Sequence, residues 1–331
     1  MISDNNSTDV PNLKQIILEL LQEIPTGMVC SYKDIALAIG DAAAARAVGT
    51  VMANNKAPDV YPCWRVVHSD GRVGKYSGDR GKEEKIEKME AEGIPVRNGK
   101  IENFPRFRFR DFDLDPPLPE LRRTQKEISN RVISEQIDSP ETVAGVDLSY
   151  GEAGVVASYV ELTRKGEKVV REETYAQSEV KFPYIPGYLA FRELPALVNL
   201  LEGMGEKGVL AEVIFVDGNG LLHPRKAGLA SHLGVELSHP TIGVAKSLLC
   251  GDVNERDLAS GETRKVEVDG EVLGLAIKTY ERANPIYVSV GNKIGLEQAG
   301  RLVLEYSKYK LPEPIRRAHK LAKSQLPRPK L

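Results

Sequence analysis

A proline- and aspartate-rich stretch, residues 111–119 (DFDLDPPLP), separates two parts of the chain that differ in periodicity. Proline interrupts helix interiors and central strands because it lacks an N–H donor and fixes φ, so we expect a linker here. Helical patterns dominate before it and strand-like runs after it. A chain of 331 residues is long enough for two cores. We therefore predict one domain over residues 1–111 and a second over residues 112–331.

The first part is predicted to be a small α-rich domain. Apolar residues at helical spacing near its start indicate one helix, and a charged helix is expected over residues 81–92. Ser31, followed three residues later by Asp34, has the pattern of a helix cap. Asp41 is placed to cap an alanine-rich helix over residues 42–53. Two short helices that meet at a tight turn are typical of a helix-turn-helix.

The second part is predicted to be an α/β domain. After a first helix, three strand-like runs separated by glycine-containing turns should form an antiparallel meander; they cover residues 142–149, 154–162 and 167–175. Helices and buried strands then alternate, with helices over 188–202 and 296–306 and strands over 213–216, 241–245, 272–279 and 286–290. This order indicates a central mixed sheet covered by helices.

Composition narrows the class of protein. No apolar run approaches the ~20 residues that span a bilayer, and the first residues lack a secretory signal, so we expect a cytoplasmic protein with no membrane contact. Three cysteines without C-x-x-C spacing argue against a disulfide framework and a structural zinc site. Residues 308–331 carry eight basic residues against one acid, which is usually a solvated end but suits phosphate contact.

Two aspartates follow apolar runs in the second part. Asp147 comes after residues 143–146 and Asp217 after residues 213–216, so each is expected at the end of a buried strand. A carboxylate there needs a cation or a basic partner, because an unpaired buried charge is costly. Two such acids favour a hard metal such as Mg²⁺, which activates water in phosphoryl transfer. The alternative is that both acids merely cap turns.

Four separated motifs in the second part resemble the endonuclease V family; they are FPYIPG at 182–187, FRELP at 191–195, VDGNGLLHPRKAGLASHLG at 216–234 and GVAK at 243–246. The resemblance implies an RNase H-like fold and hydrolysis of a phosphodiester on the 3′ side of deaminated adenine, with some relatives preferring RNA. It also implies that Asp147, Glu193 and Asp217 hold Mg²⁺, for which Mn²⁺ can substitute, and that Lys246 lies near the scissile phosphate. No organic cofactor is expected.

The same resemblance assigns the DNA-contacting residues. Tyr184, in a proline-stiffened loop, would fill the gap left when the lesion base is turned out of the stack. The base pocket would be formed by Gly187, Gly218 and Leu249. His223 is open between a hydrogen-bonding role in its loop and a part in the active site. Where many relatives have histidine this chain has Asn292, which can orient water but cannot exchange a proton near neutral pH.

The first part resembles the C-terminal domain of O-6-alkylguanine-DNA alkyltransferases, through residues 62–67 (PCWRVV), Tyr32, residues 45–49 (ARAVG) and Asn55. The resemblance implies a winged-helix-like DNA-binding domain in which Cys63 accepts the alkyl group. The resemblance also implies that Tyr32 rotates the 3′ phosphate, that Arg46 inserts into the base stack and that Asn55 supports the cysteine loop. Tyr76 and Ser77 would contact guanine, and Glu92 would be the acid of the relay that activates the thiol.

One departure keeps two readings of this domain open. The family usually has histidine after the cysteine, but this chain has Trp64, whose indole has no basic nitrogen. The domain is therefore either an alkyl acceptor or a non-catalytic sensor that binds alkylated DNA. We expect a monomeric, bifunctional DNA repair protein whose partners are DNA with alkylated guanine or deaminated adenine. The alternatives are a damage sensor fused to a nuclease and an inosine-specific ribonuclease.

Overall fold

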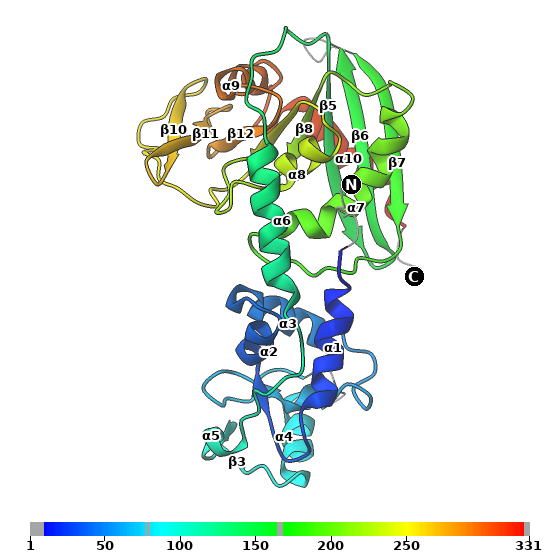
Figure 1. Ribbon diagram of the computed structural model, residues 1–331, viewed down its shortest axis with the longest axis vertical. Helices are drawn as coiled ribbons and strands as arrows, with labels where there is room; N and C mark the ends of the chain where they lie inside the picture. The colour runs from blue at the N-terminus through cyan, green and yellow to red at the C-terminus, as the bar shows by residue number, and fades with distance from the viewer. Residues whose placement is uncertain (1–9, 77, 79, 164–167, 328–331) are drawn as a thin grey trace. The chain divides into compact units, whose positions relative to one another are not determined.

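The structure is a computed structural model and describes residues 10–76, 78, 80–163 and 168–327 (Figure 1). The chain forms two compact units; residues 11–122 and 181–186 make the N-terminal unit, and residues 123–180 and 187–327 make the C-terminal unit. The division falls inside helix α6 (Pro117–Arg131), whereas the sequence placed it near residue 112. This helix begins inside the expected linker, because proline is tolerated in a first helical turn, where its missing N–H has no partner to lose.

The N-terminal unit is α-rich, as predicted. Its elements are α1 (Leu13–Glu23), β1 (Cys30–Ser31), α2 (Tyr32–Ala38), η1 (Ala42–Ala44), α3 (Ala45–Ala53), η2 (Cys63–Arg65), β2 (Val66–Val67), α4 (Lys82–Ala91), β3 (Val96–Arg97), β4 (Lys100–Ile101) and α5 (Phe104–Phe107). The Ser31 side chain accepts the Asp34 N–H, and the Asp34 carboxylate accepts the Ser31 N–H, so the predicted cap is a complete capping box. Helices α2 and α3 pack on each other as the predicted helix-turn-helix, and β3 and β4 pair antiparallel.

The C-terminal unit is built on one mixed sheet of eight strands. The strands are β5 (Thr142–Gly151), β6 (Gly154–Thr163), β7 (Val169–Gln177), β8 (Val213–Asp217), β9 (Thr241–Ala245), β10 (Thr263–Val268), β11 (Glu271–Ile277) and β12 (Ile286–Asn292). Their order is β10-β11-β12-β9-β8-β5-β6-β7. The predicted meander β5-β6-β7 is confirmed, while β5, β8 and β9 run parallel at the centre.

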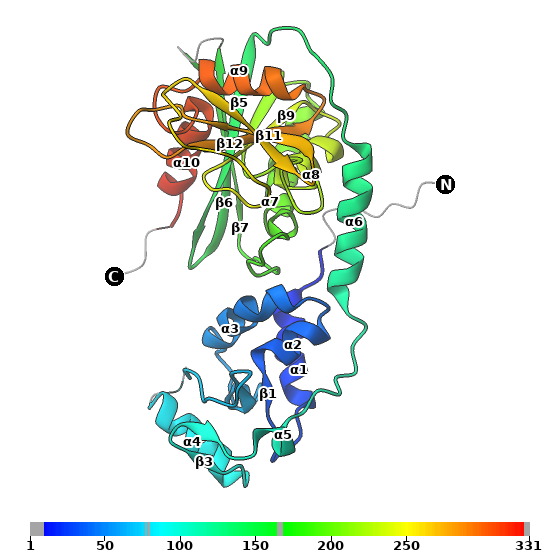
Figure 2. The same cartoon turned by 90° about the vertical axis from the view of Figure 1, so that its left-hand side faces the viewer.

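Helices cover both faces of this sheet (Figures 1 and 2). Helices α7 (Leu189–Gly205) and α8 (Leu229–Glu236) pack on one face, and α9 (Leu296–Glu305) and α10 (Glu313–Ser324) pack on the other. The basic segment from residue 308 is therefore not simply a solvated end, because Ile315 and Ala318 of α10 are fully buried against the sheet. Within the described ranges, no helix is both long and apolar enough to cross a membrane.

Candidate functional sites

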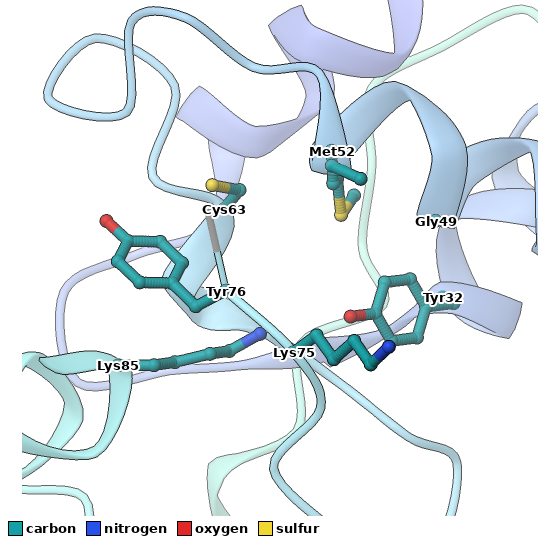
Figure 3. A pocket seen from close by; sticks show the side chains of 8 residues that line it. Tyr32, Gly49, Met52, Cys63, Lys75, Tyr76 and Lys85 are labelled. Carbon is teal, nitrogen blue, oxygen red and sulfur yellow. The ribbon is translucent and has the colours of Figure 1, made fainter. Parts of the chain in front are cut away.

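A cavity of about 320 Å³ opens beside Cys63 in the N-terminal unit (Figure 3). Cys63, Tyr76 and Lys85 line one side of it, and Tyr32 and Met52 line the other. The Tyr76 hydroxyl is buried and finds no hydrogen-bond partner among the described residues. A buried donor without a partner costs about 1–3 kcal/mol, so this cavity is suited to a ligand that completes the bond.

The loop that leads to Cys63 is held by an asparagine, as expected. The Asn55 amide donates to the Tyr61 carbonyl oxygen at 2.9 Å, and its side-chain oxygen accepts the Ala57 N–H at 3.0 Å. Cys63 follows directly as the first residue of η2 and is 3% exposed. Asn55 therefore holds the loop that leads into η2 and so to Cys63.

The expected acid of the relay is already occupied. Glu92 accepts hydrogen bonds from Trp64 Nε1 at 2.9 Å, from the Arg65 guanidinium at 2.9–3.1 Å and from the Gly27 N–H at 3.2 Å. Burial alone would raise the pKa of Glu92, but these donors lower it below its usual range. Glu92 is thus a permanent anion that joins three segments, and the indole that replaces histidine can only donate to it.

The other residues expected at DNA differ in their distance from the thiol, since Tyr32 lines the Cys63 cavity and Arg46 does not. Arg46 is exposed on α3, the second helix of the helix-turn-helix. Tyr32 begins α2; burial, and next the neighbouring Cys63, raise the pKa of its hydroxyl. Ser77 lies outside the described residues.

Three carboxylates of the C-terminal unit act on one another. Asp147 lies within β5, Asp217 ends β8, and Glu193 lies in the first turns of α7. Burial raises the pKa of Asp147, and the charge of Asp217 raises it further. Burial likewise raises the pKa of Glu193 to about 8, with Asp147 and Asp217 adding to the effect. The strands and the helix thus place the three acids that the sequence singled out near enough for their charges to interact.

The expectation that Asp147 ends its strand is wrong. β5 continues to Gly151, paired throughout with β6. Its parallel pairing with β8, however, stops at Val146. Asp147 is therefore the first residue beyond the parallel ladder, which leaves its carboxylate at an edge where ligands can approach.

Two basic side chains compensate these acids. The Lys246 ammonium contacts Asp217 Oδ2 at 2.5 Å, next to the end of β9. His319, on α10, places Nδ1 2.7 Å from Asp147 Oδ2. His319 is not among the residues predicted from the sequence, although Ile315, Ala318 and Ala322 form an apolar stripe that predicts a helix through it.

The donor set fits a hard divalent cation. No three His, Cys, Asp or Glu side chains of the described residues yet converge as ligands. Besides burial, the charge of Asp217 raises the pKa of Asp147, and the charges of Asp147 and Asp217 raise the pKa of Glu193. A bound cation would oppose these effects, and carboxylate oxygens are the ligands that Mg²⁺ prefers. Asp147, Glu193 and Asp217 would hold it.

Donors converge on the carbonyl oxygen of Gly187. Gln125 Nε2 lies 2.9 Å from this oxygen, His223 Nε2 lies 3.2 Å from it, and the Arg225 guanidinium also donates to it. His223 Nδ1 accepts the Arg225 N–H, so the neutral ring carries its proton on Nε2. Burial, and next the Arg225 charge, lower the pKa of His223 to about 4. His223 thus has the loop-holding role, one of the two left open by the sequence.

The remaining expected contacts differ in exposure. Tyr184 is 57% exposed and Leu249 is 39% exposed, so both can meet a ligand. A side chain at Gly218 would press on Leu229, with Cβ atoms 3.2 Å apart. Asn292 is buried; its amide accepts the Ile133 N–H and donates to the Gly234 carbonyl, so both ends serve the fold rather than a water molecule.

Comparison with known proteins relates both units to DNA repair. The profile of the 6-O-methylguanine DNA methyltransferase DNA binding domain matches residues 12–94, and that of Endonuclease V matches residues 125–320. A bifunctional methyltransferase/endonuclease of Thermoplasma volcanium is 39% identical over 319 residues, which are 96% of this chain and 92% of the relative.

Solved structures agree for the C-terminal unit. The catalytic domain of human endonuclease V is 33% identical with a TM-score of 0.59, and the match covers 64% of this chain and 97% of that one. Endonuclease V of Ciona intestinalis is 30% identical with a TM-score of 0.58, covering 64% and 98%. It was crystallised with a 23mer DNA that contains an inosine followed by a ribo-adenosine.

Proposed function

Because the chain belongs to the endonuclease V family, and a relative that matches nearly its whole length joins a methyltransferase to the endonuclease, we propose a bifunctional DNA repair protein. The C-terminal unit cleaves DNA on the 3′ side of deoxyinosine with Mg²⁺. The N-terminal unit transfers an alkyl group from O-6-alkylguanine to Cys63. The observation that carries the first activity is the grouping of three acids whose charges interact: besides burial, Asp217 raises the pKa of Asp147, and both raise the pKa of Glu193. Two basic side chains, Lys246 and His319, contact Asp217 and Asp147 at the same place.

The nuclease chemistry follows from the charges at the carboxylates. A bound Mg²⁺ would activate water and stabilise the charge that develops during hydrolysis. Lys246 supplies a positive charge that can contact the scissile phosphate. His319 donates Nδ1–H to Asp147, which leaves Nε2 as an acceptor able to hold a proton from the attacking water.

Recognition of the lesion is assigned to the loop and pocket residues. The exposed Tyr184 ring stacks in the gap left by the flipped base, and Pro183 and Pro186 on either side limit the entropy lost on binding. Gly187 presents its backbone to the base, since His223 and Arg225 fix its carbonyl. Gly218 and Leu249 complete the pocket.

Nicking of a duplex with one deoxyinosine by the full chain tests the nuclease. Asp147→Asn and Asp217→Asn should each lower the Mg²⁺-dependent rate at least about a hundredfold, because even outer partners of metal ligands cost 10–100-fold. Asp138→Asn, at an exposed acid of the same unit, is the matched control and should keep the wild-type rate. Undiminished nicking by Asp147→Asn would reject the metal assignment.

Alkyl transfer requires a nucleophile that meets the base. Guanine turned out of the stack would enter the cavity beside Cys63, where Tyr76 offers its free hydroxyl and Tyr32 lines the opposite wall. Arg46, exposed on α3, takes the place of the base in the stack, as expected from the resemblance. The sulfur then attacks the alkyl carbon.

Incubation of the chain with DNA that carries a radiolabelled methyl group on guanine O-6 tests this transfer. One label per chain should appear on Cys63 and disappear in Cys63→Ala. Cys30→Ala removes a thiol that lies fully buried in β1, so it should keep the label. Tight binding without label would instead support the damage sensor, which the fully occupied Glu92 carboxylate favours.

A ribonucleotide-containing substrate is the second candidate for the nuclease. The observation that favours it is the ribo-adenosine after inosine in the DNA bound by the Ciona intestinalis relative. Rates on inosine-containing duplex DNA and on inosine-containing single-stranded RNA should therefore be compared with the same Asp217→Asn control. Faster cleavage of the RNA would assign the protein as an inosine-specific ribonuclease.

A further inference from the structure

Lys85 is a buried lysine in the wall of the Cys63 cavity. It lies on α4, is 1% exposed, and lines the same space as Cys63 and Tyr76 (Figure 3). Lysine is almost never fully buried unless it is paired, because an ammonium loses its hydration. The residues that the structure describes nevertheless give Lys85 no carboxylate partner within 4.0 Å. A buried titratable group in the wall of a cavity is a candidate for a functional residue.

The one hydrogen bond described for this ammonium ties it to the cysteine segment. Nζ donates to the carbonyl oxygen of Val66 at 2.5 Å. Val66 is the residue directly after η2, which begins with Cys63. The bond therefore fixes Lys85 relative to the thiol, even though nineteen residues separate Lys85 from Val66 along the chain.

The usual route for the thiol proton is closed in this chain. Trp64 replaces the histidine, and its N–H points to Glu92 as a donor. Glu92 also receives Arg65, so its carboxylate is already neutralised by a guanidinium. A thiol is a poor nucleophile until it loses its proton, and another base must therefore act if Cys63 reacts.

We propose that Lys85 takes the thiol proton of Cys63 and holds the resulting thiolate as an ion pair, in place of a histidine–water–glutamate relay. This inference rests on the proposed alkyl transfer and names the group that activates its nucleophile. A neutral amine has one lone pair and two N–H bonds, so Lys85 can accept from the thiol while it still donates to Val66.

The reaction balances without a further reagent. The proton passes from Cys63 Sγ to Lys85 Nζ, and the thiolate attacks the alkyl carbon. The S–C bond forms as the C–O6 bond breaks, and the electron pair of that bond goes to the guanine oxygen. One proton from the ammonium returns to the base through solvent, so that a thiol and an alkylguanine become a thioether and guanine.

The neighbours of Lys85 agree with this role. Burial lowers the pKa of Lys85 to about 8, against smaller opposing effects of Cys63 and Cys30, so a usable fraction of the amine is neutral near pH 7. Burial and Asp34 raise the pKa of Cys30 well above its usual value, which keeps that second thiol protonated. Among the described residues, the titratable groups around the cavity are Cys63 of η2, Cys30 of β1, Tyr32 of α2, and Lys75 and Tyr76 of the loop before α4.

Reaction of the full chain with iodoacetamide, without DNA, tests the proposal. The rate is followed from pH 5 to pH 10 by mass spectrometry of the Cys63 peptide, with Cys63→Ser as the blank. Lys85→Met keeps the apolar stem and removes the amine, so the rate at pH 7 should fall about tenfold and the midpoint of the profile should move to higher pH. Lys82→Met, at the exposed first residue of α4, is the matched control and should leave both unchanged.

Two further variants keep the test decisive if Lys85→Met does not fold. Lys85→Arg retains a cation at the same place but cannot accept a proton. It should keep the rate at pH 7 within about threefold, since the iodoacetamide reaction measures the thiolate and a guanidinium also stabilises a thiolate as an ion pair. Glu92→Gln should leave the thiol profile unchanged. A wild-type profile in folded Lys85→Met, or a tenfold loss in Glu92→Gln with none in Lys85→Arg, would overturn the proposal. A reactive thiol that takes no methyl group from DNA would reject the alkyl transfer alone.

Discussion

Gly145 is a residue at which one added methyl group should disturb the nuclease through the packing of α10 on the sheet. It lies in β5, two residues before Asp147, and faces the start of α10. A Cβ atom there would lie 2.2 Å from the carbonyl carbon of Pro314 and 2.5 Å from the nitrogen of Ile315. Both are backbone atoms, so Gly145→Ala can be accommodated only if α10 moves away from the sheet.

The size of the effect follows from these distances. Carbon atoms in contact lie about 3.5 Å apart, so α10 must shift by about 1.3 Å at Pro314. Overpacking of this kind costs about 1–3 kcal/mol, and a backbone clash belongs at the upper end. Since each kcal/mol shifts the melting temperature of a domain of this size by about 2–4 °C, the melting temperature of the C-terminal unit should fall by about 6–12 °C. The same shift carries His319 beyond hydrogen-bond distance of Asp147, so the nicking rate should also fall.

Calorimetry of the full chain, together with the nicking assay, provides the measurement. The control is Gly203→Ala, which adds the same methyl group to an exposed position of α7 where nothing lies within 4 Å. It should melt at or slightly above the wild-type temperature, because alanine favours a helix. If Gly145→Ala melts within about 2 °C of the wild type and nicks at its rate, the contact between β5 and α10 does not support the site as described.

Three further predictions concern other parts of the chain. Tyr184→Ala should leave the melting temperature unchanged but weaken binding of an inosine-containing duplex by about 1–3 kcal/mol, as measured by fluorescence anisotropy. Tyr184→Phe should retain binding, because it keeps the ring. Equal weakening on undamaged DNA would count against the stacking role. Burial, with added effects of neighbouring charges, lowers the pKa of His232 to about 3. The stability that the neutral ring contributes above pH 6.5 is therefore lost as the pH falls toward 3. His232→Leu should flatten this loss in melts between pH 7 and pH 4, and an unchanged slope would refute the role of His232. Asp34→Asn, which leaves the Arg108 guanidinium without its bidentate acceptor, should destabilise the N-terminal unit by about 3–5 kcal/mol in urea melts, whereas exposed Asp70→Asn should have no measurable effect.

Local patterns predicted most of the regular structure. The Ser31–Asp34 cap depends on residues three apart, and the alternating runs of the meander depend on side chains two apart, so both can be read from short windows. The position of Asp147 could not be read in this way. Its strand continues because pairing with β6 extends to Gly151, whereas pairing with β8 on the other side stops at Val146. Neither pairing partner can be predicted from the local sequence.

The parts of the sites that were missed depend on contacts between distant segments. His319 stands in a run of basic residues whose composition indicates a solvated end, and only the packing of Ile315 and Ala318 on the sheet turns that run into a core helix. Lys85 lies in a helix that reads as charged on all sides. Its burial follows from its place beside Met89, one turn away, and from the Val66 carbonyl that receives it.

The bond between Asp147 and His319 joins residues 172 positions apart, and this has a consequence during synthesis. Ribosomes add about 5–20 residues each second, and N-terminal domains fold first. The thiol cavity, whose residues lie between 32 and 85, is complete while β5 is still unmade. Asp147, one of the acids proposed to hold the metal, acquires its partner His319 only when α10 has left the ribosome, so on this proposal a nascent or prematurely ended chain has an incomplete nuclease site.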